Sequence, residues 1–436
     1  MRGFRLDDVS EFEAVAIGEA QLVAWPRIAA VASMVAFSLP TFITGLELFH
    51  ALTPIETVAA LVAGSLIIFA IGAAMGTIGA RTHMSSYLLV RVAFGDRGAG
   101  LVNIAFAISL LGWFGININL FAEAASRLSG DVLGISWPQS VWFVVASVCM
   151  TATTFLGFKA INTLSTAMVP VLAIVTVMLL LGASDDQSVS QFLSEHDRES
   201  LGFGYGVSAI VGAIIIGAII LPDITRFARH WSGAVYTALI AYIVVQLAVM
   251  GAAAFAGGAT GQTDILDVML DLGLGLGAFI IVIAGSWVLN SLNLYSAVLS
   301  TKATFPQLGS APLTIGLGLL GILAASLNIL DYFVTFLFYL SMIFVPVAGV
   351  ILVDYAFIRR RDYQIDTLTN NRHFNWKGLA AWGVGAVAAI LMSENIVPSV
   401  TGMAAMDAAL ISGLIYAPLA WLERNKSGAD EIGVSS

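Results

Sequence analysis

The residues 37–50, FSLPTFITGLELFH, interrupt a long apolar run with a proline, a glycine, three hydroxyls and a carboxylate. Proline and glycine weaken a helix, and backbone groups freed at membrane depth persist only where they line a cavity or are buried in protein. We therefore expect Ser38 and Thr41 to lie beside a ligand. Two alternatives stay open: an ordinary proline kink, or hydroxyls that bond only their own backbone.

Glu47 is the acidic residue of this stretch. A carboxylate within a membrane span is costly and by default indicates a functional site. Three interpretations are open: Glu47 carries a proton during transport, contacts an amine on a substrate, or faces water and headgroups at the outer end of the span.

Two tryptophans and three asparagines lie in the middle of apolar segments, where they could hold a flat ring and pair with its edge. Asn117 follows Trp113 by four residues, and Asn290 and Asn293 follow Trp287 at helical spacing. Residues three or four apart share one face of a helix. Indoles also pack between helices, and buried amides also join helices, so both structural roles remain open.

The composition is that of an integral membrane protein. The chain is 58% hydrophobic and 11% charged, against about 25% charged in soluble domains. A single cysteine excludes a disulfide framework, and the five histidines have no metal-ligand spacing. We expect no enzyme, no cofactor, no metal and no nucleic-acid partner.

Apolar segments of about 20 residues can cross the bilayer as helices, and the sequence predicts twelve of them. These spans are 25–50, 53–80, 99–127, 137–157, 160–183, 204–222, 234–258, 273–299, 311–329, 332–357, 376–393 and 398–422.

Basic residues orient these spans. All of the 19 lysines and arginines except Arg127 and Arg198 fall on one side of the predicted membrane. The positive-inside rule then places both termini in the cytoplasm, in a multi-pass protein of the cytoplasmic membrane.

The first five spans and the next five predict an inverted repeat, because five is odd and corresponding spans begin at the same separation. Interrupted helices at matching places in two halves indicate a transporter substrate site. Span 204–222 carries Gly212, Gly217 and Pro222, so we expect spans 1 and 6 to be broken. The predicted units are the N-terminal tail 1–24, the first repeat 25–183, an outer loop 184–203, the second repeat 204–357, a basic cytoplasmic loop 358–375, two extra spans 376–422 and a tail 423–436.

Several motifs resemble one known family. GARTHMSSYLLVRVAFG (79–95), LLGWFGININLFA (110–122), PDITRFAR (222–229), LNSLNLYSA (289–297) and VDYAFIRRR (353–361) are similar to bacterial cytosine permeases of the nucleobase–cation symporter-1 family. The resemblance implies a ten-helix core plus two helices, with the substrate between spans 1, 3, 6 and 8. It also implies that a heterocycle stacks on Trp113 and that Asn290 reads its edge.

The chain departs from that family pattern where polar side chains are expected. Ala213, Ile214 and Ile216 stand at span-6 positions that supply an aromatic ring and hydroxyls in the cytosine permeases, and Gly285 replaces a span-8 asparagine. A site that pairs with a polar edge rejects analogues that lack it. We therefore expect a ligand that is less polar than cytosine, or larger, on the span-6 side, near Gly217.

The sodium site implied by the family is incomplete. Its two adjacent span-8 hydroxyls correspond here to Val288 and Leu289, which offer no oxygen to a hard cation. We expect proton coupling rather than sodium coupling, with Glu47 as the candidate carrier.

The sequence thus predicts a monomeric secondary transporter that imports a nucleobase-like heterocycle through the lipid bilayer. A carrier for an amine, a vitamin precursor or an amino acid is the alternative, and a channel or a ligand sensor is a third possibility. Asp223 with Arg226, and Asp354 with the arginines that follow it, are interpreted as gate or topology residues.

Overall fold

The computed structural model describes residues 21–134, 136–186, 189–194, 200–325, 332–363, 373–394 and 396–433. Within these ranges the regular secondary structure is helical, apart from one isolated bridge between Val23 and Ala228. Most of the predicted N-terminal tail, parts of loops 184–203 and 358–375, and the end of span 311–329 lie outside the described residues.

The helices follow one another along the whole described chain. Their bounds are α1 Trp25–Ala36, α2 Leu39–Ala51, α3 Pro54–Thr82, α4 Ser86–Phe94, α5 Gly98–Leu133, α6 Gln139–Phe155, α7 Phe158–Asp186, α8 Val189–Ser194, α9 Phe203–Ile219, α10 Pro222–Thr225, α11 Trp231–Ala238, α12 Gln246–Thr260, α13 Ile265–Asp271, α14 Gly275–Ile280, α15 Ser286–Thr304, α16 Ser310–Ala325, α17 Phe333–Val353, α19 Trp376–Ser393 and α20 Ala404–Gly433. Three π-helical segments join some of them: η3 Leu239–Val245, η4 Ile281–Gly285 and η6 Asp354–Ile358.

Among the described residues, eight helices are long and apolar enough to cross a membrane, and the bent pair α1 and α2 makes a ninth. Three shorter apolar helices, α6, α16 and the Met406–Leu422 part of α20, lie where the remaining predicted spans were placed. The all-helical membrane class is therefore confirmed, and the count of twelve spans stays a prediction.

The predicted break in span 1 is present. Helix α1 ends at Ala36, α2 begins at Leu39, and the two axes differ by 52°. Ser38 between them has an extended backbone, and Pro40 lies in the first turn of α2, where a missing N–H costs nothing. The Ser–Leu–Pro sequence thus ends one helix and starts the next.

Span 6 is not broken like span 1: Phe203–Thr225 counts as one membrane-spanning helix, and α1 with α2 is the one strongly bent pair among the described residues. Helix α9 continues through Gly212 and Gly217 to Ile219, and the short α10 starts at Pro222. A side chain at Gly212 would collide with the Leu337 carbonyl of α17, so this glycine allows two helices to approach closely. Only the proline ends the helix.

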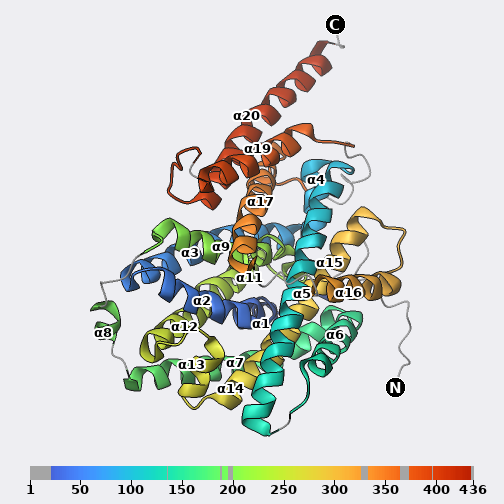
Figure 1. The fold of residues 1–436 in the computed structure, drawn as a ribbon. Helices are drawn as coiled ribbons and strands as arrows, with labels where there is room; N and C mark the ends of the chain where they lie inside the picture. The colour runs from blue at the N-terminus through green and yellow to red at the C-terminus, as the bar shows by residue number, and fades with distance from the viewer. Residues whose placement is uncertain are drawn as a thin grey trace.

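The helices pack so that the broken segment lies among the central spans. The long α5 has α4 at one end and α13 near the other, while α20 projects beyond the rest (Figure 1). Helix α3 packs along α9, α15 packs along α5, and α19 and α20 cover α17. This arrangement brings the α1–α2 break, α5, α9 and α15 around one volume.

Candidate functional site

A cavity lies at the α1–α2 break, where these two helices meet α5, α9, α10, α15 and the π-helical segment η3. Its wall therefore combines spans 1, 3, 6, 7 and 8. Five predicted site residues line it: Ser38, Thr41, Trp113, Gly217 and Asn293.

The hydroxyls at the break have two functions that do not exclude each other. Ser38 Oγ donates to the Val35 carbonyl at 2.8 Å, and Thr41 Oγ1 donates to the same carbonyl at 3.0 Å. They thereby satisfy a carbonyl that the break leaves without its helical partner. A hydroxyl that donates still has lone pairs, so both side chains can also accept a hydrogen bond from a ligand.

Trp113 is 7% exposed and is held by aromatic contacts. Its ring meets the rings of Phe333 and Phe336 on α17 edge to face, with centroids 6.0 and 5.5 Å apart. These contacts fix the plane of an indole that also lines the cavity. A fixed aromatic face at a cavity is a platform on which a flat ring can stack.

Asn290 and Asn117 do not line this cavity. Asn290 Nδ2 donates to the Phe114 carbonyl of α5 at 3.0 Å, and its Oδ1 accepts from Asn293 at 3.4 Å. Asn117 Nδ2 donates to the Trp113 carbonyl in its own helix at 2.8 Å. In this structure Asn290 therefore joins α15 to α5, and Asn293, one turn further along the same helix, lines the cavity.

Ile214 and Gly285 also lie outside the cavity lining. Ile214 is 2% exposed, and the nearby Ala213 and Ile216 line the cavity instead of it. A side chain on Gly285 would collide with the Phe37 carbonyl at the end of α1. Gly285 therefore allows span 8 to approach the break, a structural role that the family comparison of this position did not suggest.

The two sodium-site positions bring no oxygen to the break. Val288 is 1% exposed and lies outside the lining, and Leu289 lines the cavity with an alkyl side chain. Trp287 packs between helices instead of facing this cavity, and its Nε1 donates to Thr153 Oγ1 at 2.9 Å.

Asp223 lines the cavity, which the sequence did not predict. It is 1% exposed and accepts hydrogen bonds from the Ser86 N–H at 2.9 Å, from the Ser86 hydroxyl, and from Ser296 Oγ at 3.1 Å. Its carboxylate thereby joins α10 to α4 and α15. Its neighbour Arg226 is fully buried and donates to the Tyr295 hydroxyl at 3.0 Å.

Tyr242 of η3 also lines the cavity, and the sequence did not single it out. The feature that could have indicated it is a tyrosine followed four residues later by Gln246 in an otherwise apolar span.

A second cavity lies on the other side of Phe333 and carries acidic side chains. Glu47, Glu123 and Asp264 line it with Phe333. Glu47 is exposed, and its carboxylate has no hydrogen bond or ion pair within the described part of the chain. Glu47 thus lies outside the cavity that contains Trp113.

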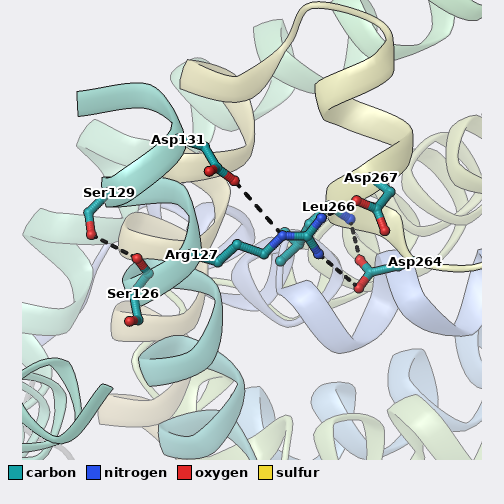
Figure 2. Close-up of polar contacts among 7 residues, drawn as sticks. All are labelled: Ser126, Arg127, Ser129, Asp131, Asp264, Leu266 and Asp267. Atoms are coloured by element: carbon teal, nitrogen blue, oxygen red, sulfur yellow. Dashed lines mark hydrogen bonds and ion pairs between the residues drawn. The ribbon is translucent and has the colours of Figure 1, made fainter. Parts of the chain in front are cut away.

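Arg127 is the cation beside this acidic cavity. Figure 2 shows its side chain reaching from α5 toward α13, where it pairs with Asp264 at 3.3 Å and with Asp267. Asp131, one turn further along α5, lies 4.0 Å away. These ion pairs tie the end of α5 to the short helix α13.

The fold and the cavity define a class of protein. A cavity at the break of a membrane-spanning helix, walled by several other spans, is how secondary transporters hold their cargo. The chain is a multi-span membrane transporter and not an enzyme.

Comparison with known proteins names the family. The model for "permease for cytosine/purines, uracil, thiamine, allantoin" matches residues 28–415, so the chain belongs to that family. The cytosine permease of Escherichia coli K12 is 29% identical over 364 residues, 83% of each chain. The hydantoin permease of Microbacterium maritypicum is 22% identical over 414 residues, 87% of this chain and 83% of that one.

The fold is also that of a solved transporter. Mhp1, a nucleobase–cation-symport-1 family transporter in a closed conformation with bromovinylhydantoin bound, matches with a TM-score of 0.79 and 20% identity over 95% of this chain and 96% of its own. The family resemblance predicted from the motifs is therefore confirmed.

Proposed function

We propose that this permease imports a nucleobase-like heterocycle across the cytoplasmic membrane by alternating access, as a secondary active transporter. The observation that supports this proposal most strongly is the position of the Trp113 indole. Phe333 and Phe336 of α17 hold it by edge-to-face contacts, and it lines the cavity at the span-1 break. Stacking of a base on an aromatic side chain contributes about 1–3 kcal/mol. The relatives are a cytosine permease and a hydantoin permease, and both heterocycles support the same class of cargo.

The wall of the cavity restricts which heterocycle fits. Hydrogen-bonding side chains come from the break, α10, η3 and α15, namely Ser38, Thr41, Asp223, Tyr242, Asn293 and Ser296. Helix α9 contributes Ala213, Ile216 and Gly217, which have no polar side-chain atom. We propose a ligand with one polar edge toward spans 1 and 8 and a less polar or larger side toward span 6.

A thermal-shift screen of the purified protein against cytosine, uracil, allantoin and hydantoin tests this class. A ligand that binds only the folded state raises its stability in proportion to the logarithm of ligand concentration. We expect at least one of these compounds to raise the melting temperature at millimolar concentration. Stabilisation by none of them, together with stabilisation by an unrelated solute, would contradict the proposal.

We propose coupling to protons rather than to sodium, because Val288 and Leu289 offer no oxygen beside the break. Uptake into proteoliposomes under separate proton and sodium gradients tests this point. The proposal requires uptake driven by the proton gradient alone. Uptake driven by a sodium gradient alone would overturn it.

Asp223 favours a second candidate, a carrier of an amine-bearing solute, because a carboxylate in the cavity can accept hydrogen bonds from an ammonium or amino group. Adding small amines, a vitamin precursor and amino acids to the same screen separates the two candidates.

The proposed topology has twelve spans, an inverted repeat of 25–183 and 204–357, and two cytoplasmic termini. The proposed transporting unit is a monomer.

A further inference from the structure

Helix α9 presents no polar side chain to the cavity, but a polar atom from the neighbouring span 7 lies at the same wall. Every residue from Ala209 to Leu221 is aliphatic or glycine. Tyr242 belongs to span 7 and lines the same cavity. A hydroxyl therefore approaches the cavity at the wall where the span-6 helix offers none.

Two glycines make room for this tyrosine. A Cβ on Gly72 of α3 would lie 2.5 Å from Tyr242 Cε2, so the ring occupies the space that a larger residue would fill. A Cβ on Gly217 of α9 would lie 3.9 Å from the Tyr242 hydroxyl. Gly217 also lines the cavity, so its missing side chain leaves a gap in α9 beside the hydroxyl.

The Tyr242 hydroxyl has no partner within the described part of the chain. Tyr242 is 1% exposed, and its hydroxyl makes no hydrogen bond there. Buried polar atoms without a partner are rare, and each calls for a water, an ion or a ligand as its missing partner. A tyrosine hydroxyl both donates and accepts, so it can pair with a ring N–H, a ring nitrogen or a carbonyl.

The backbone at Tyr242 supports a role in binding. Residues Leu239–Val245 form a π-helical segment in the middle of span 7. Such segments insert a residue into an α-helix and occur frequently at functional sites. The insertion changes which side chain faces α9.

We infer that the Tyr242 hydroxyl hydrogen-bonds the cargo through the gap left by Gly217, and so selects heterocycles whose larger or less polar side, toward α9, carries one polar atom. This inference rests on the proposed function, since it places the cargo in the same cavity. It adds a span-7 residue to a site predicted from spans 1, 3, 6 and 8, and it supplies the polar contact that span 6 lacks.

The test compares wild type with Tyr242→Phe, which removes only the hydroxyl. Binding of cytosine, uracil, allantoin and hydantoin is measured by calorimetry, and the melting temperature is measured without ligand. We expect about tenfold weaker binding of the best ligand, a smaller preference among the four, and an unchanged or higher melting temperature. In uptake assays KM rises and the maximal rate stays within about twofold.

A matched control and a second variant sharpen the result. Tyr236→Phe removes the hydroxyl of a half-exposed tyrosine of the same span and should leave binding unchanged. Gly217→Ala places a methyl group in the gap at ordinary contact distances from Val35 and from the Tyr242 hydroxyl. Both substitutions remove the same contact, the one between the Tyr242 hydroxyl and the cargo. The double variant should therefore bind no more weakly than whichever single variant binds more weakly.

The outcomes distinguish a failure of the Tyr242 inference from a failure of the proposed function. If Tyr242→Phe binds the ligand as tightly as wild type, the inference is overturned and the proposed function stands. A lower melting temperature of Tyr242→Phe without ligand would also overturn the inference alone, because it would indicate a structural partner for the hydroxyl. Additive losses in the double variant would also contradict it. If wild type binds none of the four compounds, the proposed function fails and the inference fails with it.

Discussion

Asp223 lines the cavity that contains Trp113, and Glu47 lines the acidic cavity beside Phe333 together with Glu123 and Asp264. The surroundings of the Asp223 and Glu47 carboxylates differ. Asp223 is 1% exposed and accepts hydrogen bonds from two serines on two other helices. Glu47 is exposed and makes no hydrogen bond or ion pair among the described residues.

This difference suggests that Asp223 contributes to the stability of the fold, whereas the Glu47 carboxylate can exchange protons with water. A buried carboxylate that loses its donors carries a large desolvation penalty, so Asp223 holds α10, α4 and α15 together. An exposed carboxylate gains or loses a proton at little structural cost. The Asp223 end of the protein is therefore expected to contribute more to stability than the Glu47 end.

The largest expected effect is at the Asp223 end. Asp223→Ala removes three hydrogen bonds to a buried charge and should lower the free energy of unfolding by about 3 kcal/mol or more. Asp223→Asn keeps an acceptor oxygen and should lose less. Melting curves and expression of the two variants provide the measurement, and an alanine variant as stable as wild type would remove the contrast between the two ends.

Ser296→Ala tests one donor of the same carboxylate. It removes the 3.1 Å bond to Asp223, and we expect a loss of about 1.5–3 kcal/mol, the usual range for a hydrogen bond to a charged group. Ser184→Ala, which removes an exposed hydroxyl that bonds only its own helix, is the control. Equal melting temperatures for both serine variants would show that the Ser296 bond does not stabilise the protein.

Arg127→Ala tests the ion pairs at the acidic end. The four side chains are 36 to 53% exposed, and exposed pairs contribute about 0.2–1 kcal/mol each. We expect a loss of no more than about 1 kcal/mol that becomes smaller in high salt. A loss of stability as large as that of Asp223→Ala, or a loss that does not depend on salt, would show that the Arg127 ion pairs are also important for stability.

Glu47→Gln should have the smallest effect on stability, within about 0.5 kcal/mol. If Glu47 is the proton carrier, uptake by this variant no longer depends on the proton gradient, whereas Glu123→Gln, at an exposed neighbour in the same cavity, retains that dependence. Full uptake with intact proton dependence in Glu47→Gln would exclude the carboxylate as carrier.

The sequence predicted those features that local residues determine. Ser38 and Pro40 end and begin helices by their own backbone preferences, so the span-1 break was predictable. Apolar length predicted the membrane spans, and the motif around Trp113 predicted the family. The predicted break of span 6 at its glycines is not present, because α9 runs through Gly212 and Gly217, where neighbouring helices pack closely.

The rest of the site depends on contacts that spacing does not encode. Helical spacing places Asn290 on one face of α15 but does not say that this face packs on α5. The role of Asp223 depends on serines far away in the chain. Tyr242 reaches the cavity from a π-helical segment, where the ordinary period of an α-helix no longer predicts which residue faces inward.

The most direct test of the central claim is a cryo-EM structure of the protein saturated with whichever of cytosine, uracil, allantoin and hydantoin stabilises it most. The account predicts ligand density against the Trp113 ring, between Asn293 and Gly217. Density confined to the acidic cavity beside Glu47, with the Trp113 cavity empty, would contradict it.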